Sequence, residues 1–386
     1  MAVGFRAGLS AGLSLALVAA CGPGPSPAAS PIAGGPTATP AVSPAGSQPP
    51  GSTPTPAPSA GPGATATPAA TRGPLPTGSW ARLEPAGPSP AAREDHTWTV
   101  DEAGGHAYLF GGRDGGTVFA DLWVYDLTAD RWARIDAAGP APDARFGHEA
   151  AWIPGRGLAV FAGQAGPRFF NDLWLFDPVA RTWAKLPGSA DAPVPRYGTC
   201  SGVGPDGRLW ISHGFTEDGV RFSDTPAYDF TAESWSDEFA GSEVPVERCL
   251  HACWWTDDGQ FALYGGQTTG VPALGDLWLL EPASPGSHRW REVAGDLPRP
   301  RQLAAVARLP GVTVVVGGRG LNGQPLDDAW QLVDGTATFV RLEADGRVPP
   351  ARSGATLIHD PSGGRMLLFG GLAADERDDL WAFTWP

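Results

Sequence analysis

Residues 93–135 read REDHTWTVDEAGGHAYLFGGRDGGTVFADLWVYDLTADRWARI, and this stretch decides the fold. An arginine and an apolar run come first, and a Gly-rich turn follows. A second apolar run then ends in Gly111-Gly112, and Asp121-Leu122-Trp123 opens a third. Gly and Asp at such positions favour tight reversals between strands. We therefore predict four short antiparallel strands in this stretch.

The same unit recurs along the chain, and an arginine marks the start of each copy. The gaps between these arginines are 52, 51, 52, 53 and 51 residues. A repeat period near fifty indicates a β-propeller in which each unit forms one blade. The six marker residues are Arg93, Arg145, Arg196, Arg248, Arg301 and Arg352.

Two further landmarks recur inside the units. The glycine pair returns at 265–266, 317–318 and 370–371, and Asp-Leu-Trp returns at 172–174, 276–278 and 379–381. Unit three departs most, with Asp224-Thr225-Pro226. An aromatic residue in the fourth strand completes the pattern, namely Trp132, Trp183, Trp235, Trp290 and Phe339. Over residues 79–386 these features resemble the kelch motif, which implies an all-β, six-bladed, kelch-like β-propeller of the galactose-oxidase/kelch type.

The sixth unit has three predicted strands, and the missing one is expected at the other end of the repeat. Ser79-Trp80-Ala81-Arg82-Leu83-Glu84 matches Thr338-Phe339-Val340-Arg341-Leu342-Glu343. We predict that this N-terminal strand pairs into the last blade and closes the ring. Closure would cover two sheet edges that otherwise invite aggregation.

The first residues have the pattern of an export signal. Arg6 precedes an apolar run from Ala7 to Ala20, which is too short to span a membrane. Leu17-Val18-Ala19-Ala20-Cys21 resembles the lipobox of bacterial lipoproteins. By that resemblance residues 1–20 are a lipoprotein signal peptide and Cys21 is lipidated; an ordinary secretory signal with an incidental cysteine is the alternative.

Residues 21–76 are predicted to be the lipidated cysteine and a disordered linker, and residues 77–386 the propeller. The linker is almost entirely Pro, Ala, Gly, Ser and Thr, which cannot bury a core. We therefore expect a propeller in the cell envelope, lipid-anchored to a bacterial membrane and outside the cytoplasm.

The overall charge narrows the range of partners. A net charge of −14 argues against a nucleic-acid partner, because phosphate binding requires a basic face. We expect a monomer without a cofactor or a bound metal, because the chain has no CxxC or other metal-type spacing.

Three cysteines follow the linker, and an oxidising compartment would permit a disulfide between two of them. Cys249 and Cys253 are expected on one strand, roughly 13 Å apart, which is too far to bridge. Cys200 could reach one of them if the two strands were neighbours. Three buried thiols are the alternative.

No HExxH or P-loop pattern appears, so these common catalytic signatures are missing. Kelch-type copper oxidases and a six-bladed sugar epimerase of related fold imply an enzymatic alternative that would use the channel mouth. The tyrosines of this chain fall mostly on repeat positions that packing explains. Catalytic residues are therefore not assigned.

The candidate ligand-binding residues are the six arginines together with His96, His148 and His251 three positions after three of them. A ring of arginines at the channel mouth would suit carboxylates, sulfates or acidic side chains. The alternative is structural, with arginine and histidine satisfying loop carbonyls.

The loops between second and third strands should lie on the same face as these arginines and differ in length, as specificity loops do. Phe169, Phe170 and Phe215 could contact a ligand there, although Phe170 and Phe222 fit a core position better. We expect a scaffold that presents this face to a protein or glycan ligand.

Overall fold

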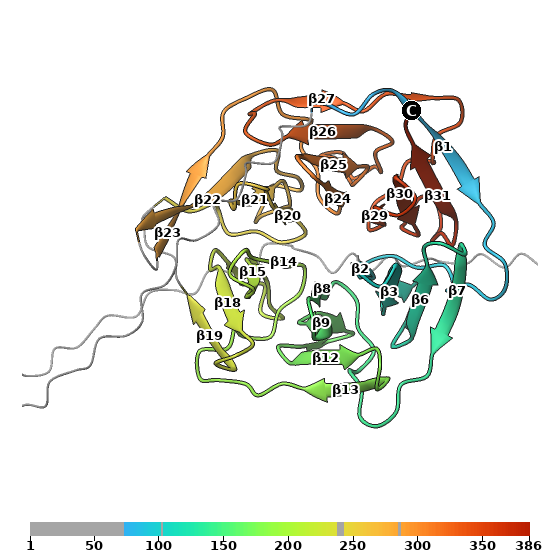
Figure 1. The fold of residues 1–386 in the computed structure, drawn as a ribbon. Helices are drawn as coiled ribbons and strands as arrows, with labels where there is room; N and C mark the ends of the chain where they lie inside the picture. The colour runs from blue at the N-terminus through green and yellow to red at the C-terminus, as the bar shows by residue number, and fades with distance from the viewer. Residues whose placement is uncertain (1–72, 102, 238–242, 285–286) are drawn as a thin grey trace, which may run out of the picture. The chain divides into compact units, whose positions relative to one another are not determined.

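The computed structural model describes residues 73–386 except 102, 238–242 and 285–286. Its regular elements there are β-strands, and six sheets stand around a central axis as the blades of a propeller (Figure 1). The predicted all-β, six-bladed propeller is therefore confirmed. Among these described residues, no helix is long and apolar enough to cross a membrane.

Each blade has four antiparallel strands, ordered from the channel to the rim. Blades 1 to 3 consist of β2 (Thr97–Asp101), β3 (His106–Phe110), β6 (Leu122–Asp126), β7 (Arg131–Ile135); β8 (Glu149–Ile153), β9 (Gly157–Phe161), β12 (Leu173–Asp177), β13 (Thr182–Lys185); and β14 (Cys200–Val203), β15 (Leu209–Ser212), β18 (Pro226–Asp229), β19 (Ser234–Asp237). Blades 4 and 5 consist of β20 (Ala252–Trp255), β21 (Phe261–Tyr264), β22 (Leu277–Ser284), β23 (Ser287–Glu292); and β24 (Ala305–Leu309), β25 (Val312–Val316), β26 (Ala329–Val333), β27 (Phe339–Arg341).

Blade 6 is assembled from both ends of the propeller sequence. It contains β29 (Thr356–Asp360), β30 (Arg365–Phe369) and β31 (Leu380–Thr384), and β1 (Gly78–Leu83) pairs antiparallel with β31. The predicted closure is thus confirmed, with Trp80 opposite Phe383 in the register. A short strand that the sequence did not predict, β28 (Ala344–Asp345), adds to β1 in parallel.

The second strands lie deepest in the molecule, because both of their faces are covered by neighbouring blades. All five residues of β9 and of β25 are buried. The fourth-strand aromatic closes each blade-to-blade core; Trp132, for example, packs with Trp98 of its own blade and Phe369 of blade 6. The repeated aromatics therefore pack between blades, as their spacing predicts.

The glycine pairs allow the end of the second strand to turn sharply. Gly265 and Gly266 have φ of 69° and 94°, and a Cβ at Gly266 would lie 2.8 Å from the Cys249 carbonyl oxygen. Ala162 and His213 keep the positive φ where blades 2 and 3 lack the first glycine. The backbone conformation is therefore retained where the residue type has changed.

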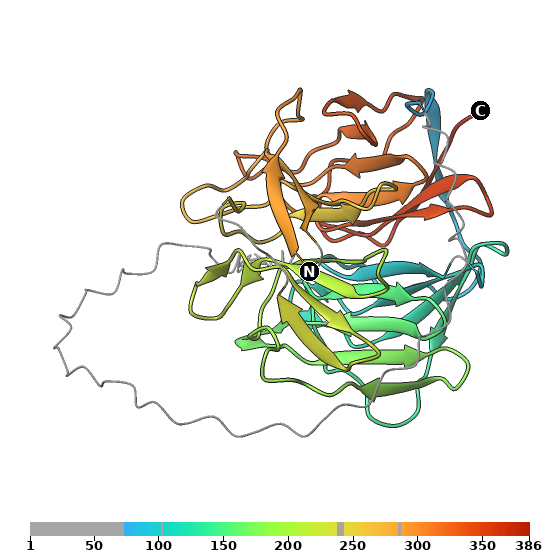
Figure 2. The same cartoon turned by 60° about the vertical axis from the view of Figure 1, so that its left-hand side comes forward.

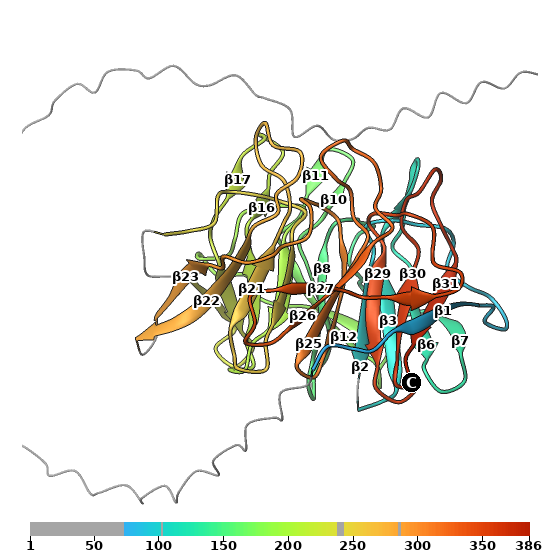
Figure 3. The same cartoon turned by 90° about the horizontal axis from the view of Figure 1, so that it is seen from above.

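We call the loop face the side formed by two kinds of connection: those between second and third strands, and those from a fourth strand to the next blade. Short hairpins rise from this face: β4 (Arg113–Asp114) with β5 (Thr117–Val118), β10 (Gln164–Ala165) with β11 (Arg168–Phe169), and β16 (Gly214–Phe215) with β17 (Arg221–Phe222). Seen from above, β10, β11, β16 and β17 project on one side of the ring (Figure 3). The turned view shows the blades around the channel (Figure 2).

Candidate functional site: the channel and the loop face

Each marker arginine is bound within its own blade. Arg301 donates from Nη1 to the Gly317 carbonyl at 2.9 Å, and its Nη1 and Nη2 grip both oxygens of Asp328 at 2.8 and 3.0 Å. Its Nε reaches the Arg299 carbonyl at 3.3 Å. The same fork holds the other pairs, Arg93–Asp121, Arg145–Asp172, Arg196–Asp224, Arg248–Asp276 and Arg352–Asp379.

These contacts change the interpretation of the arginine ring. All six arginines are at most 2% exposed, and a carboxylate neutralises each of them. The arginines therefore do not form the cationic ring expected at the channel mouth. Their bonds to loop carbonyls match the structural alternative, and any contribution to ligand binding stays a prediction.

Aromatic rings cover the guanidinium planes on the loop side. The ring centroid of Phe119 lies 4.1 Å from the guanidinium carbon of Arg93, and that of Phe170 lies 4.1 Å from the guanidinium carbon of Arg145. The corresponding distance from Phe222 to Arg196 is 4.5 Å. Phe170 is buried, so its predicted core role is confirmed. Desolvation by these rings strengthens the ion pair beneath them.

Two of the candidate histidines join neighbouring blades. His148 Nε2 lies 2.9 Å from Thr97 Oγ1, and His96 Nε2 lies 2.8 Å from Thr356 Oγ1. Burial, together with the nearby Arg145 charge, lowers the pKa of His148 to about 3. His148 is therefore neutral at pH 7.

His251 has a different neighbour from the other two histidines. Its ring packs edge-on against His213, with 5.4 Å between ring centroids. Burial, the neighbouring His213 and Arg248 lower the pKa of His251 well below its usual range. His96 and His148 each bond to a threonine of the preceding blade. Blade 3, which precedes the blade of His251, has Cys200 at the position of that threonine. Among the described residues, no three His, Cys, Asp or Glu side chains gather as a metal site.

A closed ring of backbone hydrogen bonds encircles the loop-face end of the channel. One residue per blade takes a φ between 54° and 64° there, and its amide donates to the carbonyl of the same residue in the preceding blade. The donor–acceptor distances are 2.7–3.0 Å. The six residues are Asp95, Gly147, Gly198, Leu250, Leu303 and Gly354.

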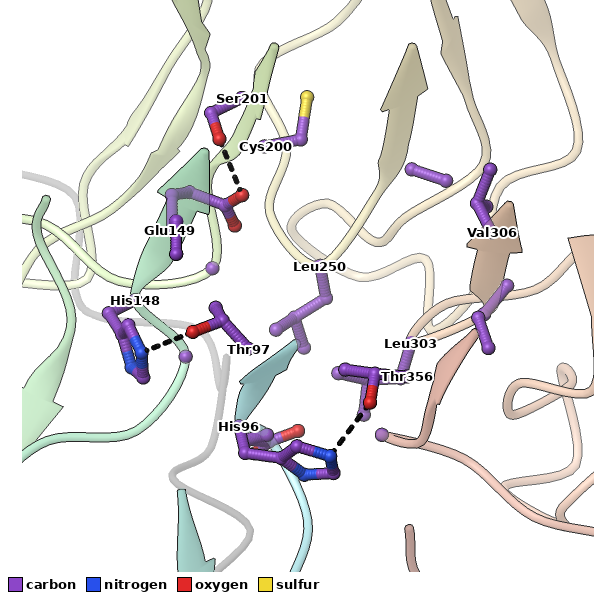
Figure 4. A pocket seen from close by; sticks show the side chains of 18 of the residues that line it. His96, Thr97, His148, Glu149, Cys200, Ser201, Leu250, Leu303, Val306 and Thr356 are labelled. Carbon is purple, nitrogen blue, oxygen red and sulfur yellow. Dashed lines mark hydrogen bonds between the residues drawn. The ribbon is translucent and has the colours of Figure 1, made fainter. Parts of the chain in front are cut away.

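A cavity of ≈ 230 Å³ lies along the channel beside this ring. It is lined by the first residues of all six innermost strands, with hydroxyls from Thr97, Thr199, Ser201 and Thr356. Figure 4 shows Thr97, Ser201 and Thr356 around the channel, with Glu149 bonded to Ser201. The cavity therefore offers hydrogen-bonding groups beside apolar side chains such as those of Leu250 and Leu303.

Among the acidic side chains that line the cavity, Glu149 has the most strongly shifted pKa. Burial raises its pKa to about 8, although the hydrogen bond from Ser201 Oγ at 3.0 Å acts in the opposite direction. The Glu149 carboxyl therefore holds its proton through much of the neutral range. The repeat pattern did not predict this, because Glu149 occupies a position held by Thr, Cys or Ala in other blades.

The structure resolves the cysteine alternatives. Cys200 of β14 forms a disulfide with Cys253 of β20, which joins blades 3 and 4 beside the channel. Cys249 is a buried thiol outside this disulfide. The expectation that Cys249 shares a strand with Cys253 was wrong, because β20 begins at Ala252 and Cys249 pairs instead with Gln267.

Sequence reasoning missed a buried arginine on the loop face. Arg221 is 8% exposed, and its guanidinium lies 5.3 Å from the Phe215 ring. Nη1 donates to Thr269 Oγ1 at 2.8 Å, whereas Nε and Nη2 have no hydrogen-bond partner. Arg221 differs from the six marker arginines because it lies outside the repeat pattern.

The loop face also carries most of the exposed apolar side chains. Eight large apolar residues of the described chain are exposed, and six of them lie on this face, over blades 3 to 6. We call these six the apolar arc. They are Val194, Val220, Val246, Val271, Leu321 and Val348.

Comparisons with known proteins agree with this geometry. The chain is 26% identical to an F-box/kelch-repeat protein of Arabidopsis thaliana, At1g51550, over 73% of this chain and 66% of that protein. It is 27% identical to adagio-like protein 1 of Oryza sativa subsp. japonica, over 79% of this chain and 51% of that protein. The chain thus spans about half to two thirds of the length of these relatives.

A solved structure, that of YjhT, shares the fold with a TM-score of 0.61 and 17% identity, over 76% of this chain and 95% of that one. Residues 74–266, half of the chain, match the family described as the KLHDC2/KLHL20/DRC7 Kelch-repeats domain. With six blades that repeat the same arginine–aspartate fork and glycine turn, this chain belongs to the kelch-repeat family.

Proposed function

We propose that this protein is a binding scaffold that presents the loop face of its propeller to a protein partner. The apolar arc is the observation that carries this proposal. Exposed apolar side chains scatter over most surfaces, but here six of eight gather on one face. Exposed apolar side chains on one face contribute to binding by the area that a partner removes from water.

Arg221 adds a polar contact to this surface. Its buried Nε and Nη2 have no hydrogen-bond partner, and because a guanidinium binds planar oxygen groups well, they suit an acceptor on the partner once a movement of the surrounding loop exposes them. Arginine is enriched among the residues that dominate binding energies at interfaces. The loop face thus combines an apolar arc with one buried donor.

The test is site-specific photo-crosslinking in living cells of the source organism. A benzophenone amino acid is placed in turn at Val220, Val271 and Leu321, with Val179 on the opposite face as the matched control. A protein adduct of one defined mass from the three loop-face positions, and none from Val179, supports the proposal. Equal adducts from Val179, or no adduct at all, would refute it.

We further propose that Cys21 carries a lipid anchor and that the propeller works outside the cytoplasm. The lipobox-like residues 17–21 support the anchor, and the disulfide between Cys200 and Cys253 suits an oxidising compartment. Residue 21 itself lies outside the described residues. Labelled palmitate should enter the wild-type protein and not Cys21→Ser; equal incorporation would contradict the anchor.

The polar channel favours a second candidate function, a site for a small carbohydrate with or without turnover. Glu149 with a raised pKa next to hydroxyl groups is the arrangement of a general acid. Calorimetry with a panel of monosaccharides, including a glycan acid, tests this candidate. Binding that is lost in Glu149→Gln supports it, and an absence of heat throughout the panel removes it.

A further inference from the structure

Five blades complete the arginine–aspartate fork with an indole. The residue two positions after each fork aspartate is a tryptophan, and its Nε1 donates to Oδ2 of that aspartate at 2.7–2.9 Å. Blade 3 is the exception, because Pro226 stands at this position. The five pairs are Trp123–Asp121, Trp174–Asp172, Trp278–Asp276, Trp330–Asp328 and Trp381–Asp379.

A cavity of ≈ 520 Å³ lies where blade 3 lacks the ring. Its walls include Pro226, Trp235, Phe222 and Val194, and Asp224 lines it as well. This volume falls within the roughly 300–1,000 Å³ of pockets that hold small ligands. The cavity is therefore large enough for a flat bicyclic ring.

The repeat shows that this cavity occupies the place of an indole. In blade 6 the guanidinium of Arg347 lies 5.3 Å from the Trp381 ring, and Arg347 stands five residues before Arg352. Asp191 stands five residues before Arg196 and lines the blade 3 cavity. The same connection that covers the indole in blade 6 therefore covers the cavity in blade 3.

The carboxylate of blade 3 is open on the side where an indole binds elsewhere. Asp224 accepts from Arg196 Nη1 at 2.7 Å and Nη2 at 2.9 Å, and no tryptophan donates to it. Its side chain is 31% exposed, whereas the other five fork aspartates range from 5% to 22%. A carboxylate oxygen that accepts one bond retains capacity for another donor.

We propose that this cavity is a receptor for the indole side chain of a tryptophan on a partner protein, whose N–H is donated to Asp224. The rings of Trp235 and Phe222 and the Pro226 ring supply apolar walls, and Asp224 supplies the acceptor. In the five other blades, a tryptophan side chain occupies the corresponding place beside the fork aspartate. The inference deepens the proposed function by naming a chemical feature of the partner.

The test uses an isolated probe, so its result does not depend on the crosslinking experiment. N-acetyl-5-fluorotryptophan amide is titrated with the propeller and followed by ¹⁹F NMR. We expect saturable binding with Kd on the order of 1 mM, as befits a single side chain. The 1-methyl analogue, which lacks the donor N–H, should bind at least fivefold more weakly.

The matched variant fills the cavity from the chain itself. Pro226→Trp restores the residue of the other blades and should abolish probe binding while raising Tm, whereas Val179→Trp on the opposite face should change neither. Should Pro226→Trp fail to fold, Val194→Arg blocks the cavity from an exposed position and should weaken binding at least fivefold. Failure of the probe to bind the wild type, or binding equal in wild type and blocked variants, would overturn the proposal.

Discussion

Glu149 shows how one residue in the channel makes stability depend on pH. Its pKa of about 8 in the folded protein exceeds the value near 4.5 of an unfolded chain. The folded state therefore keeps a proton that the unfolded state has lost between these two values. The contribution of Glu149 to stability is complete below about pH 4.5 and is lost as the pH rises through about 8.

Glu149→Gln should remove this dependence, because the amide stays neutral and can still bond to Ser201. We expect the variant to melt about 2–4 °C higher than the wild type at pH 9 and to match it at pH 4.5. Thermal unfolding followed by circular dichroism at both pH values measures the difference. A constant offset at both pH values would show that the carboxyl does not titrate as its burial implies.

The fork arginines differ from surface arginines in their energetic weight. Arg301→Ala leaves Asp328, which is only 5% exposed, with the more distant Arg299 Nε at 3.4 Å as its remaining counter-charge. We expect a loss of roughly 3–5 kcal/mol in the free energy of unfolding, as for other broken buried pairs. Denaturant titration is the measurement.

The control is Arg168→Ala, which breaks an exposed pair with Asp143 and should cost less than about 1 kcal/mol. If Arg301→Ala were as mild as Arg168→Ala, the fork would not be structural, and a ligand-binding role for the arginines would regain support.

At the scale of secondary-structure elements, a disulfide joins strand β14 of blade 3 to strand β20 of blade 4. The corresponding contact between blades 2 and 3 is a hydrogen bond. The residues that form the Glu149–Ser201 hydrogen bond between blades 2 and 3 correspond by position to Cys200 and Cys253 between blades 3 and 4. The disulfide thus replaces a hydrogen bond at one seam of the ring.

Removing this bond should destabilise the propeller. The bridge closes a loop with a sequence separation of 53, for which chain entropy gives about 4 kcal/mol. Cys200→Ser/Cys253→Ser should therefore melt several degrees lower than the wild type under oxidising conditions. Under a reductant the two proteins should melt within about 2 °C of each other; a difference that persists there would point to packing and not to the bond.

For the whole molecule, ring closure is the decisive feature. β1 supplies the fourth strand of blade 6, and Trp80 packs with Phe383 at 5.1 Å between ring centroids. Deletion of every residue before Glu84 exposes an edge of β31 and removes a buried indole.

We expect this truncated propeller to melt at least 10 °C lower than a protein that begins at residue 74, and to aggregate on heating. Trp80→Ala in the full propeller separates the indole from the strand and should cost about 3–5 kcal/mol. Equal melting of the truncated and complete propellers would mean that β1 does not close the ring.

The architecture of this protein could be predicted from the amino-acid pattern alone. The number of blades follows from the spacing of the arginines, together with the glycine pairs and the aromatic residues of the fourth strands. The match of residues 79–84 to Thr338–Glu343 predicts the closing strand. These features are local or repeated, and strand pairing within a blade involves neighbours along the chain. They can therefore be read without knowing the distances between blades.

The roles of the site residues depend on contacts that form when the chain folds. Arg93 and Asp121 are 28 positions apart, so their ion pair and the burial of the guanidinium become visible only once the blade has folded. The raised pKa of Glu149, the partner of Cys200 and the cavity beside Pro226 depend on contacts between blades or between connections. Burial and charge pairing depend on residues that are far apart in the sequence and close together in space. They therefore cannot be predicted from the order of residues alone.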